Sequence, residues 1–507
     1  MICLALSPVV QVRCPRPEQP FRYSPNPPQI PRPSRIRGTA GTAILYRQWN
    51  ERSGNATQYS SFNFANSTPG MPNELQPSTI CTSGAASVAH WLGVGTAHAH
   101  AGNITDASAA FDEALRLAPG SIEACETACA QLGYCYYGLR EFEKSIEMLE
   151  RAAQCNPGNR HVWLYRAAAL HELHRYEEAI PAYEKLLADD PNDYHAKWAL
   201  AQLYRITDDF SKGWAAMYRY LPRRTLRKPE WKGEDLSDKT LLVYHQHGFG
   251  DLIMYMRTLP LINAKKIILA VKPNLLRLLQ SAAPGVDEVV SLSEANLDAL
   301  EYDYHTNEAD QLRLLDNIST ACNPIAMPYL KADQSLEKAW RERVEADGNF
   351  RVGIAWSANT AHYGGNDPRV IPLANWRPLA ELPNVSFYSL QKDEASSQIS
   401  DAPQLRIIDL GGDISDFADS AALMSSLDLV ISIDSSPAHL AGALGRPVWT
   451  LLPNKSDWRW RRERSDHPWY PSMRLFRQGV RQSWEDLLIQ VRDELAQLLR
   501  DRGNRTC

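Results

Sequence analysis

The hydrophobic pattern between residues 85 and 222 repeats at a regular interval. Aromatic, glycine and alanine positions recur in the order expected of two antiparallel helices, and a proline ends the second helix of each unit. Pro157 and Pro191 are 34 residues apart, which is the period of the tetratricopeptide repeat (TPR). The interval from Pro119 to Pro157 is four residues longer, so one linker is extended. One helical hairpin cannot bury its apolar face, and the units are therefore predicted to stack into an α-helical TPR solenoid.

Small residues predict where the two helices of a unit approach one another. Gly95, Gly133 and Ala167 occupy corresponding places in successive units, where a larger side chain would hold the helices apart. A fourth, degenerate unit is predicted at about 194–220. The repeats are predicted to recruit an acceptor or a protein partner, or to self-associate, and an inert spacer is an open alternative.

From residue 238 the pattern changes to short apolar runs that alternate with helical segments. This alternation is typical of parallel sheets covered by helices. It predicts two Rossmann-like halves, at 238–335 and 345–480, with ligands in the cleft between them, and a C-terminal helix at 482–501. The stretch that follows residue 292 and runs through Lys331 is interpreted as irregular. The expected strands are 241–244, 266–271, 288–292, 352–356, 385–390, 406–409, 429–433 and 448–452.

Composition narrows the choice of partners and compartment. The net charge is −5, from 54 Lys and Arg against 59 Asp and Glu, and such a balance gives no reason to expect nucleic acid as a partner. The 9 cysteines are scattered, which favours a reducing, cytoplasmic environment over a disulfide framework. No apolar run is long enough to predict a transmembrane segment. Residues 1–84 are rich in Pro and Ser and are predicted to be a disordered tail. The tail is either functional or an inert or wrongly assigned start.

A glycine-rich turn follows the first strand of the first α/β half. Gly248 and Gly250 permit positive φ and close approach of a ligand to the backbone. Asp251 is expected at the start of the next helix, where the helix dipole favours the ionised carboxylate. A carboxylate at the edge of a cleft is a reasonable general base, although a simple helix cap explains the same residues equally well.

The strongest candidate motif follows the apolar strand 429–433. Ser436 is expected to cap the next helix, and Pro437 suits its first turn. The free N–H groups of such a helix start are a ready site for a pyrophosphate. His439, in the first turn, is placed to donate to the same oxygens, although a plain strand–helix–strand unit is the alternative. The predicted donor-binding residues of this motif are Asp434, Ser435, Ser436 and His439.

Three other stretches lie at predicted strand ends. Asn359 and Arg369 belong to the loop after residue 356, and Arg369 is a candidate for pairing with a phosphate. Gln391 and Lys392 end the next strand at the same sheet edge. Lys392 and Arg369 are predicted to bind the donor, and Gln391, Asn359, Gly248 and Gly250 are possible loop contacts. The stretch 457–462 is dense in Trp and Arg. It is suited either to stacking on a nucleotide base and neutralising phosphate or to packing between domains, and packing is favoured.

These motifs together resemble a known group of enzymes. The region from Leu241 to about Gln478 is similar to the bacterial glycosyltransferases related to ADP-heptose:lipopolysaccharide heptosyltransferases (glycosyltransferase family 9), and the layout also resembles O-linked GlcNAc transferases. In this resemblance Asp251 matches the base of the glycine–Asp loop, and Asp434, Ser435 and His439 match the donor motif. One departure is His245, which stands where the family pattern leads one to expect Glu. The stretches that resemble the subgroup with N-terminal TPRs are Trp356-Ser357, Ser389-Leu390-Gln391-Lys392 and Asp457-Trp458-Arg459-Trp460.

The resemblance implies a GT-B fold and an inverting transfer of a hexose or heptose from a nucleotide sugar to a hydroxyl of a glycan or protein. The chain has no Asp-x-Asp motif and no metal-ligand cluster in its sequence, so no metal or other cofactor is predicted. Two rival functions remain: a catalytically inactive TPR scaffold, and a nucleotide-sugar epimerase on the same fold.

Overall fold

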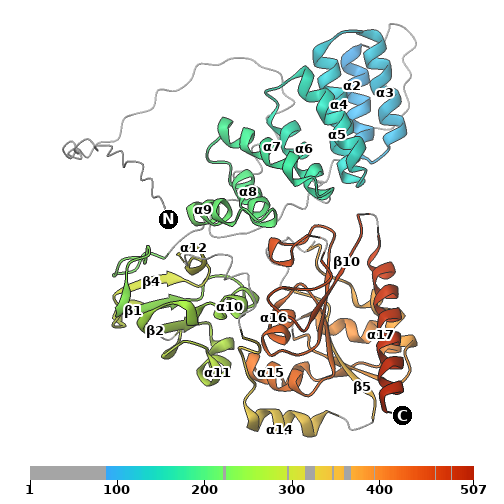
Figure 1. The fold of residues 1–507 in the computed structure, drawn as a ribbon. Helices are drawn as coiled ribbons and strands as arrows, with labels where there is room; N and C mark the ends of the chain where they lie inside the picture. The colour runs from blue at the N-terminus through green and yellow to red at the C-terminus, as the bar shows by residue number, and fades with distance from the viewer. Residues whose placement is uncertain are drawn as a thin grey trace, which may run out of the picture. The chain divides into compact units, whose positions relative to one another are not determined.

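The computed structural model describes residues 87–220, 224–293, 296–314, 326–344, 348–358, 367–392, 394–462, 464–480 and 482–506. The tail predicted at 1–84 and the candidate residue Asn359 lie outside these ranges. The described residues form a run of paired helices followed by two regions in which parallel strands alternate with helices (Figure 1). The predicted order of a helical repeat followed by an α/β region with two parallel sheets is confirmed.

The repeat region consists of antiparallel helix pairs. Successive helices pack as α2 with α3, α4 with α5, α6 with α7 and α8 with α9 (Figure 1). The last pair corresponds to the degenerate fourth unit. The helices are α2 (Val88–His100), α3 (Ile104–Leu117), α4 (Ile122–Gly138), α5 (Phe142–Cys155), α6 (Arg160–Glu172), α7 (Tyr176–Asp189), α8 (Tyr194–Ile206) and α9 (Phe210–Tyr220).

The turn inside each helix pair shows the repeat at the level of the backbone. One residue in each turn has positive φ, at Gly102, Arg140, His174 and Asp208. The last three are spaced at the 34-residue period, whereas the first interval is four residues longer, as the proline spacing predicts. The predicted close approach also occurs, since a Cβ on Gly95 would lie 2.6 Å from the ring of Phe111.

The first α/β region contains a four-stranded parallel sheet in the order β3-β2-β1-β4. Strand β4 lies in the stretch interpreted as irregular. That interpretation is wrong because β4 is buried although most of its side chains are polar, so no apolar run marks it. The elements are β1 (Leu236–Tyr244), α10 (Phe249–Met256), η1 (Leu259–Leu261), β2 (Ala264–Val271), α11 (Pro273–Ala282), β3 (Glu288–Ser291), η2 (Leu297–Ala299), β4 (Tyr304–Asn307) and α12 (Gln311–Leu314).

The second α/β region contains a six-stranded parallel sheet in the order β10-β9-β8-β5-β6-β7. Its strands are β5 (Phe350–Ala355), β6 (Val385–Ser389), β7 (Ile408–Asp409), β8 (Leu429–Ile433), β9 (Val448–Leu452) and β10 (Met473–Arg477). Its helices are α14 (Gln334–Arg343), η4 (Leu373–Glu381), η5 (Glu394–Asp401), η6 (Pro403–Leu405), η7 (Gly411–Asp413), α15 (Phe417–Ser425), α16 (Ser436–Ala443), η8 (Trp458–Trp460) and α17 (Trp484–Thr506).

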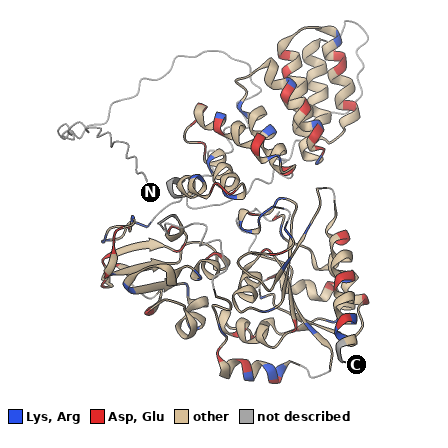
Figure 2. Cartoon of the chain, in the orientation of Figure 1, with Lys and Arg blue, Asp and Glu red and all other residues tan. Residues whose placement is uncertain are grey.

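Several boundaries in this region differ from prediction by one or more residues, among them those of β5, β6, β7 and α17. Strand β7 is shorter than 406–409, because Arg406 has a left-handed backbone (φ 48°) that ends η6. Helix α17 continues beyond 501, and acidic and basic side chains are interleaved along it (Figure 2). Its predicted start is confirmed, since Ser483 N donates to Asp486 Oδ2 and Asp486 N donates to Ser483 Oγ.

The two α/β regions are joined by helix-to-helix contacts. The guanidinium of Arg277 in α11 is bound to the carboxylates of Asp416 and Asp419 at the start of α15, at 2.7 and 2.6 Å. Helix α10 of the first α/β region also packs on α16 of the second. One continuous cluster of buried apolar side chains extends from the later repeat helices through the four-stranded sheet to α15 and α16. These contacts bring the carboxyl ends of β1 and β8 together.

Candidate active site

The glycine-rich turn after β1 holds Asp251 in the first turn of α10. Gly248 is the N-cap of this helix, and its N–H donates to Asp251 Oδ2 at 3.1 Å. The other oxygen, Oδ1, accepts a hydrogen bond from Arg459 Nη2 at 2.7 Å. The Asp251 side chain remains 23% exposed, so its carboxylate is reachable from solvent. The motif therefore presents a fixed, ionised carboxylate at a strand end.

Gly250 is needed for a close approach rather than for an unusual backbone. Neither Gly248 nor Gly250 has positive φ, so the expectation that these glycines supply that conformation is wrong. A Cβ on Gly250 would lie 2.8 Å from His439 Cδ2 and 3.5 Å from Ser436 Cα. The start of α10 therefore rests directly against the start of α16, which brings the candidate base to the predicted donor motif.

The cap of α16 differs from the prediction. Ser435, with an extended backbone (φ −156°, ψ 173°), is the N-cap, and Ser436 is already the first helical residue, so Ser436 does not cap the helix. The Ser435 side chain makes no cap hydrogen bond; its Oγ lies 3.1 Å from Ser432 Oγ instead. Ser435 and Ser436 are half-buried. The start of α16 thus presents amides that the side chain of its N-cap residue leaves uncapped.

His439 lies beneath this helix start as a neutral imidazole. It is buried, it stacks on Trp460 with ring centroids 5.1 Å apart, and its Nδ1 lies 3.1 Å from Tyr470 Oη. Burial, with a further contribution from the charge of Arg459, lowers the pKa of His439 to about 3. Its Nε2 makes no hydrogen bond to any residue that the structure describes.

Arg459 is the central cation of the site. The sequence singles out its stretch, 457–462, but Arg459 itself is not among the predicted site residues. It lies 2.7 Å from Asp251 and 3.1 Å from Asp457. Burial opposes the charge on Arg459, but Asp457 and Asp251 raise its pKa well above the ordinary value. The favoured packing interpretation of 457–462 holds for Trp458 and Trp460, which are fully buried. It overlooks the arginine between them.

The pKa values of the two site aspartates shift in opposite directions. Burial is the largest influence on Asp251 and would raise its pKa, but Arg459, His247, His439 and the hydrogen bond from the Gly248 N–H together outweigh it and hold that pKa below its ordinary value. Burial raises the pKa of Asp434, against the opposing charges of Arg369 and Arg459. Asp251 is therefore ionised near neutral pH and able to interact with a proton donor.

The remaining predicted residues lie at the same sheet edge with different partners. Arg369 is paired with Asp367, with Nη2 2.6 Å from Oδ2, and its Nη1 lies 3.3 Å from the carbonyl oxygen of Asp434. Gln391 Oε1 accepts from the backbone N–H groups that follow β5, at 3.2 and 3.0 Å. Lys392 is exposed, and its Nζ donates to Ser415 O at 2.6 Å, beside the start of α15. The structure thus groups Arg369 with Asp434, and directs Lys392 toward α15.

Glu308, which follows β4, is a site residue that the sequence pattern does not predict. This fully buried carboxylate accepts from the backbone N–H of Gln246 at 2.9 Å and of His247 at 2.7 Å. It also lies 3.0 Å from His247 Nδ1. Burial opposes charge on both partners, yet their mutual attraction lowers the pKa of Glu308 and raises that of His247. A carboxylate does support the glycine-rich turn, but it comes from the neighbouring strand and not from position 245.

The repeats contact the segment that carries Arg459. Turn residues of three successive helix pairs reach the second α/β region: Arg140 Nη2 donates to Val480 O at 3.0 Å, His174 Nε2 lies 3.0 Å from Asn454 O, and Asp208 pairs with Arg461. The edge of the solenoid formed by these turns is therefore in contact with the segment after β9 and, at Val480, with the chain after β10.

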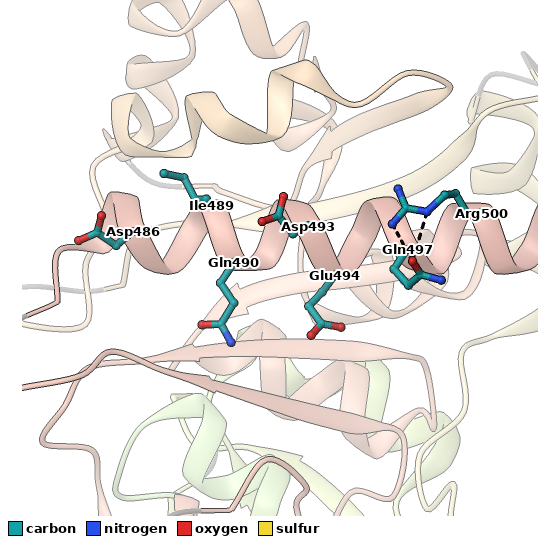
Figure 3. Close-up of a pocket in the computed structure, with 7 residues that line it drawn as sticks. All are labelled: Asp486, Ile489, Gln490, Asp493, Glu494, Gln497 and Arg500. Carbon is teal, nitrogen blue, oxygen red and sulfur yellow. Dashed lines mark hydrogen bonds between the residues drawn. The ribbon is translucent and has the colours of Figure 1, made fainter.

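A separate hollow lies along α17 and is not part of this site. Figure 3 shows seven polar and apolar side chains of that helix around it, with Arg500 hydrogen-bonded to Gln497. All of its lining residues come from one helix and from no strand end. In the part of the chain that the structure describes, no group of three or more His, Cys, Asp or Glu side chains could hold a metal ion. No helix within the same ranges is long and apolar enough to cross a membrane.

Comparison with protein families assigns both parts of the chain. Residues 83–122, 131–194 and 172–225 match the tetratricopeptide repeat, and residues 372–487 match glycosyltransferase family 9 (heptosyltransferase). The second match covers α16, His439 and Arg459, whereas Asp251 lies outside it. The chain therefore combines TPRs with a glycosyltransferase family 9 region.

Individual relatives cover different parts of the chain. Protein FlbA of Caulobacter vibrioides is 26% identical over 427 residues, which are 79% of this chain and 66% of FlbA. A peroxisomal targeting signal receptor of Kluyveromyces lactis is 39% identical over 70 residues, 14% of this chain and 12% of the receptor. A solved glycosyltransferase family 9 structure from Veillonella parvula is 11% identical and aligns with 52% of this chain and 99% of its own, with a TM-score of 0.39. The chain thus spans slightly less than two thirds of the length of FlbA.

Proposed function

We propose that this chain, in which TPRs precede a glycosyltransferase family 9 region, transfers a sugar from a nucleoside-diphosphate sugar to a hydroxyl acceptor with inversion at the anomeric carbon. The observation that carries the proposal is the contact between α10 and α16. It sets the ionised carboxylate of Asp251 beside an uncapped helix start and a partly buried arginine. A base for the acceptor and a receptor for a diphosphate are thereby held within one site.

The helix start and Arg459 receive the donor diphosphate in this proposal. Backbone N–H groups at the start of a helix favour anions through both hydrogen bonding and the helix dipole. Arg459 adds a fixed positive charge, and its guanidinium forms paired hydrogen bonds with phosphate oxygens. Since Arg459 is bound to Asp251 in the structure, the incoming diphosphate competes with that carboxylate for it.

Asp251 removes the acceptor proton as the sugar is displaced. The acceptor oxygen attacks the anomeric carbon, the bond to the diphosphate breaks, and the diphosphate leaves with the electron pair. Arg459 and the amides of α16 stabilise the departing charge, a role that preorganised dipoles and cations perform in other transferases. His439 is neutral, and it therefore offers this site a hydrogen bond and not a charge. These groups supply the stabilisation without a bound metal, so the transfer is proposed to be metal-independent.

The sugar is proposed to be a hexose or heptose, and the acceptor a glycan or a protein brought by the repeats. Support for the first part is the heptosyltransferase description of the matched family. Support for the second is the presence of TPRs in contact with the segment that carries Arg459. Residues 434–436, His439 and Arg369 are proposed to surround the nucleotide diphosphate, with Lys392, Gln391 and Asn359 as further loop contacts.

A donor-consumption assay on the full chain tests this function. The chain is incubated with a panel of nucleoside-diphosphate sugars, and release of nucleoside diphosphate is measured with and without added glycan or protein acceptors. We expect at least one donor to be consumed, and Asp251→Asn to be slower by about 10²–10⁴-fold, the range typical of a general base. Asp112→Asn, an exposed carboxylate on α3, is the matched control and should leave the rate unchanged.

The outcomes separate the rival functions. Consumption of no donor would favour an inactive scaffold. Conversion of the donor sugar to its epimer without release of nucleoside diphosphate would identify an epimerase. Equal rates for Asp251→Asn and the wild-type chain would remove the base assignment, and an unchanged anomeric configuration in the product would remove inversion.

A further inference from the structure

We propose that Gln202, in repeat helix α8, is a positioning residue for the candidate base: it holds Asp457, which holds Arg459 against Asp251. This inference rests on the proposed role of Asp251 in transfer. It gives the last repeat a part in the chemistry, in addition to any role in recruitment. Four consecutive contacts, from Arg205 to Asp251, carry it.

The chain of contacts begins at Arg205, a buried arginine whose side chain is confined by its neighbours. Arg205 in α8 is fully buried, and its guanidinium lies over the rings of Trp458 at 4.7 Å and Trp214 at 5.0 Å. Its Nε donates to Ala201 O at 2.9 Å. A Cβ on Gly213 would lie 2.4 Å from Arg205 Cγ, so α9 also confines the side chain. Arg205 is therefore a fixed donor.

The first two contacts orient the amide of Gln202. Arg205 Nη2 donates to Gln202 Oε1, so the amide oxygen faces the arginine. The NH₂ group of Gln202 then faces the opposite way, and Nε2 donates to Asp457 Oδ2 at 2.9 Å. An amide has one accepting and one donating end, which these two partners require. A carboxylate at position 202 would bind Arg205 but repel Asp457.

The third contact fixes Arg459 through the other oxygen of Asp457. Asp457 Oδ1 accepts from the backbone N–H of Arg459 at 3.2 Å and lies 3.1 Å from its Nε. The neighbouring arginines are also held by repeats, since Arg461 pairs with Asp208 and Arg462 Nη1 lies 3.1 Å from Glu177 Oε1. The segment that bears Arg459 is thus attached to the repeats at several points.

The last contact, from Arg459 Nη2 to Asp251 Oδ1 at 2.7 Å, transmits this arrangement to the base. Other titratable groups that interact with Asp251 are His247 from the glycine-rich turn and His439 from α16, and Glu308 is bound to His247. His245, Lys272, Tyr255, Tyr470 and, from α8 itself, Arg205 also interact with it electrostatically. Arg205 is unchanged in a substitution of Gln202, so that substitution reaches Asp251 through Asp457 and Arg459.

The test compares Gln202→Met with Gln154→Met in the full chain. Methionine is similar in length to glutamine and makes neither hydrogen bond, and Gln154 is an exposed residue on repeat helix α5. We expect Arg459 to pair less tightly with Asp251 in Gln202→Met. The carboxylate of Asp251 is then stabilised by less nearby positive charge. The acid limb of the kcat/KM–pH profile should move to higher pH by about 0.5–1 unit, whereas Gln154→Met should superimpose on the wild-type profile.

Hydrogen exchange gives a second readout that does not depend on turnover. We expect faster amide exchange in residues 248–256 and 457–462 of Gln202→Met, with helices α2–α5 unchanged. Asp457→Asn should accelerate the same peptides, and the double variant should be no faster than the faster single variant, because both changes break one chain of contacts.

The outcomes separate this inference from the proposed function. Unchanged exchange and an unshifted profile in Gln202→Met would overturn the positioning role while leaving an active, Asp251-dependent enzyme in place. Accelerated exchange in a chain that consumes no nucleotide sugar would retain the structural coupling and refute the proposed function. Loss of folding in Gln202→Met would show in the α2–α5 peptides, and Asp457→Asn would then decide the question by the same exchange criterion.

Discussion

Single charged residues in the candidate site are stabilised by partners from other elements. Asp251 on α10 depends on Arg459 from the segment after β9, and that arginine depends in turn on Asp457. Breaking a buried ion pair by removing one partner leaves the other charge uncompensated, which is costly. Substitutions at Arg459 should therefore affect the ionisation of Asp251 as well as donor binding.

The neutral state of His439 predicts how the stability of the folded chain depends on pH. Its folded-state pKa of about 3 lies below the ordinary value of 6.5, so between these values the unfolded chain binds a proton that the folded chain does not. Stability then falls as pH decreases below 6.5. His439→Gln removes this contribution. As pH decreases, the free energy of unfolding of the variant should therefore fall less steeply than that of the wild-type chain, and the two slopes should differ by about 1.4 kcal/mol per pH unit near pH 5.

Urea unfolding at pH 5.0, 5.5, 6.0 and 7.5 measures this difference, since about 1.4 kcal/mol per pH unit corresponds to one proton. Other buried histidines titrate in both proteins and cancel in the comparison. Parallel stability curves for the two proteins would contradict the assignment of His439 as a neutral, buried imidazole.

The sequence was sufficient for those site residues whose type and spacing follow a local pattern. Asp251 follows a glycine-rich turn, and His439 lies in the first turn of the helix that follows an apolar strand. The role of Glu308, and a site role for Arg459 in place of the favoured packing, depend on tertiary contacts that the sequence does not show. Glu308 acts from a strand with no apolar run, and Arg459 lies between two tryptophans that dominate the local pattern. The sequence predicts Ser436 as the N-cap of α16, but Ser435 is the N-cap. Residue propensity alone does not resolve a shift of one residue.

Among the elements, the crossing of α10 and α16 positions the site. It depends on the absence of a side chain at Gly250, where an added Cβ would meet the imidazole of His439 at 2.8 Å. Overpacking of a rigid contact forces neighbouring side chains or backbone to shift. The separation of the two helices is thus sensitive to a single methyl group.

Gly250→Ala should destabilise the chain by about 1–3 kcal/mol and reduce donor consumption, because the methyl group displaces His439 and separates α10 from α16. The measurement is chemical denaturation together with the donor assay. Gly93→Ala is the control: this exposed glycine of α2 has no atom within 4 Å of an added Cβ, and alanine is the better helix former. It should be stabilising by about 0.5–1 kcal/mol. Equal effects of the two substitutions would contradict the close crossing.

The elements themselves were predicted best where periodicity was strong. The repeat period is visible in the prolines and reappears in the positive-φ turns at Arg140, His174 and Asp208. The parallel strands with apolar runs were also identified. Boundaries were less certain because they depend on individual backbone conformations, as Arg406 shows at β7.

At the scale of the whole molecule, the repeats and the sheets share buried surface. The main apolar cluster includes side chains of the later repeat helices, the four-stranded sheet and α15 and α16. Trp214 of α9 lies against Trp458 with ring centroids 5.3 Å apart. Such shared packing couples the stability of the repeats to that of the α/β regions.

The later repeats and the α/β regions should therefore unfold in one cooperative transition. Differential scanning calorimetry of the full chain, followed in parallel by far-ultraviolet circular dichroism and tryptophan fluorescence, should give coincident midpoints. A nucleoside diphosphate that binds the native chain should raise that shared midpoint. A separate, earlier transition of helices α6–α9 would contradict the common core.

The most direct measurement of the central claim is a crystal structure of the full chain with a bound nucleoside diphosphate. We expect the diphosphate oxygens within hydrogen-bonding distance, about 3 Å, of the Ser436 N–H and the Arg459 guanidinium, facing the carboxylate of Asp251. A diphosphate bound away from α16, or a complex in which Asp251 is turned away from it, would contradict the account.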